Sequence, residues 1–148
     1  MIILAIDPGT EKSAFVVWDT EQRKVLDKGI IPNSMMLISC SCGDYDVLSI
    51  EMIASYGMPV GKEVFETVRW IGKYEQCAAN YKKAAARLVY RKDIKIHFCN
   101  SVKAKDANIR QAILDLLGKE RTKGVSKDMW SALAVAMYTE TIVSALEK

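Results

Sequence analysis

The hydrophobic pattern of the chain falls into two parts. In the first part, apolar residues form short runs, a continuous one over residues 2–7 and three others over 13–18, 25–31 and 46–51. Such runs predict β-strands, and the short turns between the first three favour an antiparallel meander. Residues 33–41 fit either a short helix or a loop.

A loop with two glycines and a proline, residues 52–61, precedes a change of period. After it, apolar residues recur at helical spacing, which predicts a long helix over 62–87 and two more over 104–117 and 126–146. The last helix is apolar nearly all round, so we expect it to be buried. Residues 94–99 predict a fifth strand. This order of elements predicts a mixed α/β domain of three layers.

The composition is that of a globular protein. Of the 148 residues, half are apolar and about a quarter are charged, which excludes a disordered or fibrous chain and predicts one domain over residues 1–148. The longest uncharged stretch, residues 29–43, is too short and too polar to span a bilayer, and the first residues form no basic leader. We therefore expect a cytoplasmic protein with no membrane partner.

Charge is distributed unevenly along the chain. Residues 1–61 carry four basic and eight acidic side chains, whereas residues 62–148 carry seventeen basic and ten acidic ones. A basic surface beside an acidic half is typical of a protein that holds a polyanion, such as nucleic acid, against a carboxylate site. A lysine excess on solvated helix faces would give the same counts.

Three carboxylates occupy positions where an unpaired charge is costly. Asp7 ends the first strand, Glu51 ends the fourth, and Asp128 lies in the first turn of the last helix. Buried carboxylates are stable when they are paired or bind a cation, and hard ions such as Mg²⁺ prefer oxygen ligands. Two such ions can drive phosphodiester hydrolysis without a catalytic histidine. This chemistry suits a chain that contains a single histidine. Each residue also has a purely structural interpretation, as a turn former, a loop cap and a partner of the helix dipole, respectively.

Four motifs follow one another along the chain: ILAIDPGT at 3–10 with SAFVV at 13–17, VLSIE at 47–51, SVK at 101–103 and KDMWSALAVA at 127–136. In this order they resemble the opening hairpin, second acidic strand, lysine-bearing segment and final helix of RuvC-type Holliday junction resolvases. The short chain looks most like a phage-encoded member, which would act in the cytoplasm of a bacterial host.

The resemblance implies an RNase H-like nuclease domain with a central five-stranded mixed sheet, acting as a homodimer. It implies Mg²⁺-dependent cleavage of Holliday junctions, with forks and flaps as further branched DNA substrates and Mn²⁺ as a substitute ion. Asp7, Glu51 and Asp128 would be catalytic metal ligands, and Lys103 would stabilise charge beside the scissile phosphate.

Ser131 departs from the pattern that the family usually shows, an acid three residues after the position of Asp128. A hydroxyl is a weaker metal ligand than a carboxylate. The second ion would then be bound weakly, through water, or by another group such as Glu11. Alternatively, the chain is a non-catalytic protein that binds branched DNA without cutting it.

The loop after Glu51 lies where the resemblance places a junction-probing loop. Tyr56 or Met58 could wedge against unpaired bases there, although an ordinary glycine-bounded turn explains the same residues. The apolar face of the long helix after it could form the dimer interface. Basic residues that follow the loop are the expected phosphate contacts: Lys62, Arg69, Lys73, Lys82, Lys83, Lys105 and Arg110.

A different enzyme class shares part of the first motif. The hairpin around Asp7, Gly9 and Thr10 also resembles the phosphate-binding hairpin of actin-like ATPases and sugar kinases. Those enzymes close a second, similar domain over the nucleotide, and 148 residues leave no room for it.

Overall fold

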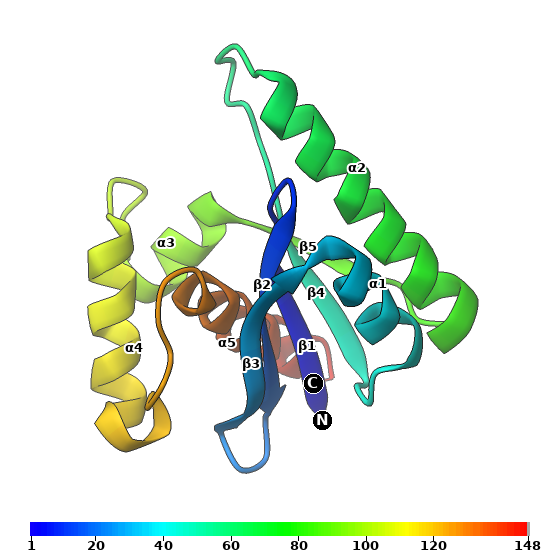
Figure 1. The fold of residues 1–148 in the computed structure, drawn as a ribbon. Helices are drawn as coiled ribbons and strands as arrows, with labels where there is room; N and C mark the ends of the chain where they lie inside the picture. The colour runs from blue at the N-terminus through cyan, green and yellow to red at the C-terminus, as the bar shows by residue number, and fades with distance from the viewer. Residues whose placement is uncertain (148) are drawn as a thin grey trace.

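Five strands form one mixed sheet at the centre of the protein in the computed structural model, which describes residues 1–147 (Figure 1). The strand order is β3-β2-β1-β4-β5. The first three strands are antiparallel, as expected, and β4 and β5 run parallel to β1. Their bounds are β1 Ile2–Asp7, β2 Lys12–Asp19, β3 Lys24–Pro32, β4 Val47–Met52 and β5 Arg87–Tyr90.

Helices cover both faces of this sheet, which confirms the three-layer prediction (Figure 1). One layer consists of α1 (Asn33–Cys42) and α2 (Lys62–Cys77), the latter extended by a π-helical turn over Ala78–Lys82. The other layer consists of α3 (Arg91–Cys99), α4 (Asp106–Arg121) and α5 (Met129–Leu146).

Side chains that alternate along β1 divide the interior into two cores. Ile3 and Ala5 pack against the layer of α3, α4 and α5, whereas Leu4 and Ile6 pack against α1 and α2. Successive side chains on a strand point to opposite faces. Asp7 therefore belongs to the face that α5 covers, at the point where the apolar run ends.

Helix α5 is the central helix of the second layer. It is long and apolar enough to cross a membrane by length and composition alone. Its residues 132–137 are buried in the core against the sheet, and Thr139 exchanges a 2.6 Å hydrogen bond with Ser49 of β4. Burial of its middle was predicted from the sequence, and it explains the apolar composition.

Two predicted elements are wrong. Residues 94–99 form helix α3 rather than a strand, and the fifth strand, β5, lies at 87–90, just where the predicted long helix was expected to end. Ile94, Ile96 and Phe98 alternate as in a strand. In the structure Ile94 and Phe98 share a buried helical face, while Ile96 is exposed. The ambiguous segment at 33–41 is helical.

Candidate active site

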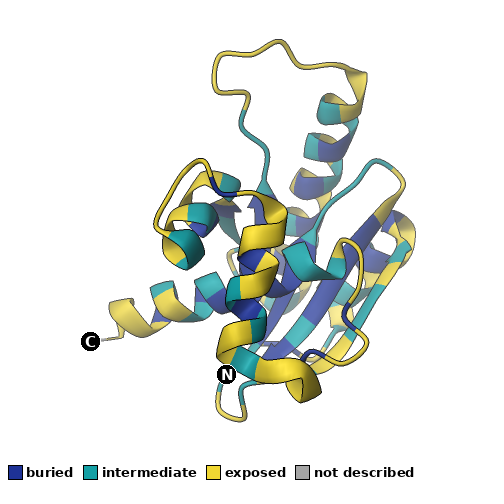
Figure 2. Cartoon of the chain, turned by 90° about the vertical axis from the view of Figure 1, so that its left-hand side faces the viewer, coloured by how far each residue is buried: buried dark blue, intermediate teal, exposed yellow. Residues whose placement is uncertain are grey.

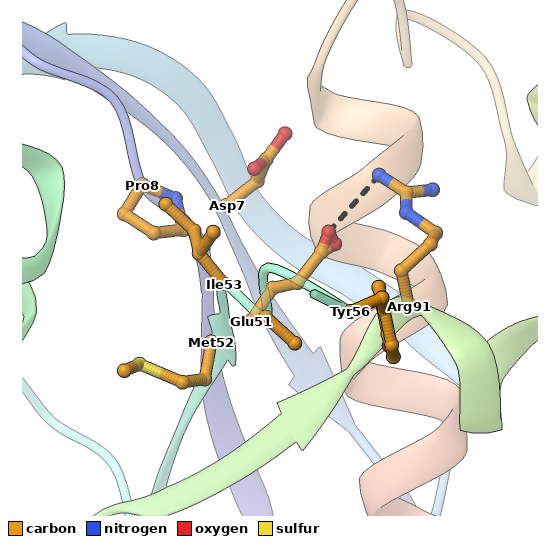
Figure 3. Close-up of a pocket in the computed structure, with 8 residues that line it drawn as sticks. Asp7, Pro8, Glu51, Met52, Ile53, Tyr56 and Arg91 are labelled. Atoms are coloured by element: carbon orange, nitrogen blue, oxygen red, sulfur yellow. Dashed lines mark ion pairs between the residues drawn. The ribbon is translucent and has the colours of Figure 1, made fainter. Parts of the chain in front are cut away.

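The carboxyl ends of three parallel strands bring polar residues to one edge of the sheet. Ile6 pairs with Ile50, so Asp7 and Glu51, the next residues of β1 and β4, are neighbours on the face covered by α5. Glu51 in turn pairs with Val89 of β5, and Arg91 follows two residues later. Figure 3 shows the side chains of Asp7, Glu51 and Arg91 projecting into the same space. Such strand ends are the usual place for a ligand site in an open α/β sheet.

Hydrogen bonds from β2 and α1 hold the turn that follows Asp7. Asn33 donates a 2.9 Å hydrogen bond from Nδ2 to the carbonyl oxygen of Gly9, and Ser13 donates one of 2.7 Å to Asn33 Oδ1. A side chain at position 9 would collide with the carbonyl oxygen of Lys12. These contacts therefore fix the path of the chain directly after Asp7, at the end of β1.

Burial and mutual repulsion dominate the electrostatics of the site. Burial raises the pKa of Asp7 to about 8, with further contributions from the Glu51 and Asp128 carboxylates, and Arg91 opposes the shift. Burial also raises the pKa of Glu51, against the lowering effect of Arg91. Grouped carboxylates whose pKa values are raised in this way are stabilised in their charged form by a bound cation.

Arg91 is the cation that the chain itself supplies. Its Nη2 lies 3.0 Å from Glu51 Oε1 and 3.1 Å from Ser131 Oγ, and its Nη1 lies 3.0 Å from Asp106 Oδ1. Arg91 is the first residue of α3, Asp106 the first of α4, and Ser131 lies in the first turn of α5. One guanidinium therefore joins β4 to three helix starts.

Asp128 stands at the N-terminal end of α5. Lys127, immediately before it, has a left-handed backbone with φ of 52°, which turns the chain into the helix. Asp128 contributes to the raised pKa of both Asp7 and Glu51, so its charge acts on the same site. The charge of Asp128 thus reaches the two other carboxylates that the sequence singled out, and their joint role as metal ligands stays a prediction.

The residues of the candidate site line two cavities. Asp7, Glu51, Tyr56 and Arg91 line a cavity of about 200 Å³ (Figure 3). A larger groove of about 550 Å³ runs between α4 and the start of α5. Its polar lining includes Asp106, Asp128, Ser131, Lys127 and Arg110.

The residues present fit a hard divalent cation in two respects. All the candidate ligands are oxygen donors, and Glu51 Oε2 is buried without a hydrogen-bond partner among residues 1–147. Over the same residues, no three potential ligands lie close enough to form a ready-made metal cluster. Arg91 contacts Glu51 and Asp106 on either side, so its guanidinium now provides the positive charge.

Lys103 and Glu11 line neither of these two cavities. Lys103 is exposed on the connection between α3 and α4, and Glu11 is exposed in the turn before β2. Two lysines that the sequence analysis did not select, Lys92 and Lys95, line a further cavity of about 330 Å³ together with Tyr56 and Arg91.

The loop between β4 and α2 stands out from the body of the protein (Figure 2). Tyr56 is 64% exposed and Met58 is 71% exposed. Tyr56 also has a left-handed backbone, with φ of 50°. Because Tyr56 lines the cavity that contains Asp7, the loop places an aromatic ring beside the carboxylates.

The basic residues chosen from the sequence are scattered over several elements. Arg110 lies 5.0 Å from the centre of the Trp130 ring and lines the groove. Lys82 donates a 2.8 Å hydrogen bond to the carbonyl oxygen of Gly43 and lies over Tyr45, so its ammonium is engaged within the fold. The other predicted phosphate contacts are exposed: Lys62, Arg69, Lys73, Lys83 and Lys105.

No known family profile and no curated protein matches this sequence. Solved structures do share its fold. Thermus thermophilus RuvC aligns with a TM-score of 0.78 at 14% identity, over 98% of this chain and 97% of that one. T. thermophilus RuvC in complex with a Holliday junction substrate aligns with a TM-score of 0.75 at 14% identity, over 97% and 96%. The chain has a RuvC-type fold.

The RuvC-type fold confirms the RNase H-like architecture that the motifs implied, with its five-stranded mixed sheet. At 14% identity the alignment establishes the fold and not the activity. Neither structure bears on a phage origin.

Arg91 and Asp106 are the site residues that sequence reasoning missed. Arg91 follows a strand of four residues that was not predicted, because no element was expected between residue 87 and residue 94, so nothing marked Arg91 as the residue after a strand end. Asp106 lies in a basic, exposed segment where it has the form of an ordinary first-turn acid. The sequence signal that could have pointed to Asp106 is its position at the start of a predicted helix, three residues after Lys103 of the SVK motif.

Proposed function

We propose that this protein is a metal-dependent, structure-selective endonuclease that cleaves Holliday junctions and other branched DNA. One observation carries the proposal: Asp7 and Glu51 stand side by side at the ends of parallel strands, and the charge of Asp128 acts on both. The RuvC-type fold supports it, because one neighbour with this fold is described in complex with a Holliday junction substrate.

Asp7, Glu51 and Asp128 would hold Mg²⁺ or, in its place, Mn²⁺. The bound ion would supply activation of water and stabilisation of the leaving oxygen of a phosphodiester. The chain's own residues do the rest. The raised pKa of Asp7 means that this carboxyl releases its proton when it becomes a ligand. Basic side chains around the site, with Lys103 at the scissile phosphate, would hold the DNA backbone.

The DNA-binding surface would combine an aromatic wedge with basic side chains. Tyr56 and Met58 on the exposed loop would stack on unpaired bases at a branch point. The exposed basic residues named above would bind phosphates, with the exception of Lys82. A homodimer formed through α2, where Phe65 is 61% exposed, would present two sites to the two strands of a four-way junction.

The decisive experiment incubates the protein with a labelled immobile four-way junction in Mg²⁺, beside a linear duplex. Wild-type protein should make symmetric nicks near the branch point. Asp7→Asn should cut at least about 100-fold more slowly, because it removes a metal ligand, while it still binds the junction. EDTA should stop cutting without full release of DNA. Asp44→Asn, an exposed position, is the matched control.

Cutting by Asp7→Asn at the wild-type rate would refute the proposed role of the carboxylates. A second candidate function rests on Ser131, the hydroxyl that stands where an acid was expected. If this residue marks a lost ligand, the protein binds junctions tightly and makes no nicks in Mg²⁺ or Mn²⁺. That outcome would identify a non-catalytic branched-DNA-binding protein.

A further inference from the structure

Asp106 faces the same guanidinium as two residues of the candidate site. Its Oδ1 lies 3.0 Å from Arg91 Nη1, and Arg91 Nη2 binds Glu51 and Ser131 at 3.0 and 3.1 Å. Asp106 also raises the pKa of Asp7 and of Glu51. A carboxylate on α4 therefore acts on the site at which β1, β4 and α5 meet.

Position 131 and position 106 are far apart in sequence and converge in space. Ser131 and Asp106 bind the two terminal nitrogens of one guanidinium, which are only about 2 Å apart by the covalent geometry of arginine. An acid missing from the first turn of α5 is thus matched by an acid at the first turn of α4. Both residues also line the groove between these helices.

Helix capping does not account for the orientation of Asp106. At the start of α4, the amide of Lys105 is bound by Asn108 Oδ1 at 2.8 Å, and Asp106 turns its carboxylate toward Arg91. A second, independent observation points to a ligand. Glu51 Oε2 is buried and lacks a hydrogen-bond partner among the described residues, although Glu51 Oε1 is bound by Arg91.

We propose that Asp106 supplies the fourth carboxylate of the divalent-cation site, in place of the acid that is absent at Ser131. Arg91 holds Asp106 at the site until the cation takes over its charge. This inference rests on the proposed function, and it removes the main objection to it, because Asp106 then provides the carboxylate that position 131 lacks.

Direct binding of Mn²⁺ alone, measured by titration calorimetry without DNA, tests the inference. Asp106→Asn should bind Mn²⁺ at least about 10-fold more weakly than wild type, because a charged ligand is lost. Ser131→Ala should stay within about 2-fold, because the inference gives its hydroxyl no ligand role. Asp115→Asn, an exposed acid on the same helix, is the matched control.

A double variant makes the test specific. In Asp106→Asn/Ser131→Asp the acid moves from α4 to α5 at the same guanidinium, and Mn²⁺ affinity should recover most of the loss. Asp106 is 78% exposed at its side chain, so its replacement leaves the fold intact, which circular dichroism verifies. Wild-type Mn²⁺ affinity in Asp106→Asn would overturn the inference.

Two reference variants separate this inference from the proposed function. If Asp7→Asn and Glu51→Gln lose Mn²⁺ binding while Asp106→Asn keeps it, the fourth ligand is refuted and the metal site stands. If all three bind Mn²⁺ as wild type does, or wild type binds none, the metal site and the inference fail together.

Discussion

The ionisation of Asp7 couples stability to pH at the residue scale. Its pKa is about 8 in the folded protein and 3.8 in the unfolded chain, so folding takes up a proton between these values. The free energy of unfolding of the metal-free protein must therefore fall as pH rises from about 4 to about 8. At pH 8 in EDTA, we expect Asp7→Asn to be more stable than wild type by on the order of 2 kcal/mol, as urea unfolding would measure.

The same measurement at pH 4 is the internal control for Asp7. The carboxyl is neutral there in the folded protein and only about half ionised in the unfolded chain, so the free energies of unfolding of the two proteins should agree to within about 0.6 kcal/mol. Saturating Mg²⁺ at pH 8 should stabilise wild type more than Asp7→Asn, since a ligand that binds only the folded state stabilises it. Parallel pH profiles in EDTA would show that Asp7 is not the group responsible.

The three carboxylates of the candidate site could be found in the sequence because each lies at one end of an apolar run. Asp7 and Glu51 end apolar strands, and Asp128 precedes an apolar helix, so an acid at each place stands out. Asp106 and Arg91 interrupt no pattern, because each lies among exposed charged residues. Their role comes from a contact between residues fifteen positions apart, which depends on how α3 and α4 pack.

At the scale of elements, Arg91 connects the start of α3 to β4, α4 and α5. Arg91→Gln removes the positive charge beside the buried Glu51, and we expect it to lower the free energy of unfolding by about 2 kcal/mol in EDTA. Saturating Mn²⁺ should reduce that loss, because the cation replaces the missing charge. Chemical unfolding with and without Mn²⁺ measures both effects.

Lys92→Gln removes one positive charge from the same helix at an exposed position and serves as the control for Arg91→Gln. It should change the free energy of unfolding by less than about 0.5 kcal/mol, as surface substitutions usually do. Equal stability of Arg91→Gln and Lys92→Gln in EDTA would show that the Arg91 ion pairs contribute nothing to joining these elements.

Helices and strands could be predicted from the sequence where they are long and are buried on more than one side. Strands β1, β2 and β4 lie between two helical layers and therefore read as apolar runs, and α5 is apolar because its middle lies in the core. Strand β5 has four residues at the edge of the sheet, too few to show a period. The apolar alternation in α3 imitated a strand, and only the packing of the helix on α5 decides between the two.

At the scale of the whole molecule, the basic half of the chain supplies the surface around an acidic centre. Lys92 and Lys95 line a cavity with Tyr56 and Arg91, which also line the cavity that contains Asp7 and Glu51, and the proposed function places the DNA backbone there. Lys82 is engaged with Gly43 and Tyr45 beyond the far end of α2. Equal charges in the two places should therefore contribute unequally to junction binding.

The salt dependence of binding distinguishes these lysines. Each phosphate contact contributes about 0.9 to the slope of log affinity against log salt concentration. Lys92→Gln/Lys95→Gln should weaken junction binding and reduce the slope by about 2, whereas Lys82→Gln should leave it unchanged. Fluorescence anisotropy over a range of NaCl concentrations, in Ca²⁺ to prevent cutting, measures the slope. A loss of slope in Lys82→Gln that equals that in the double variant would mean that net charge alone, and not the surface beside Asp7 and Glu51, attracts the DNA.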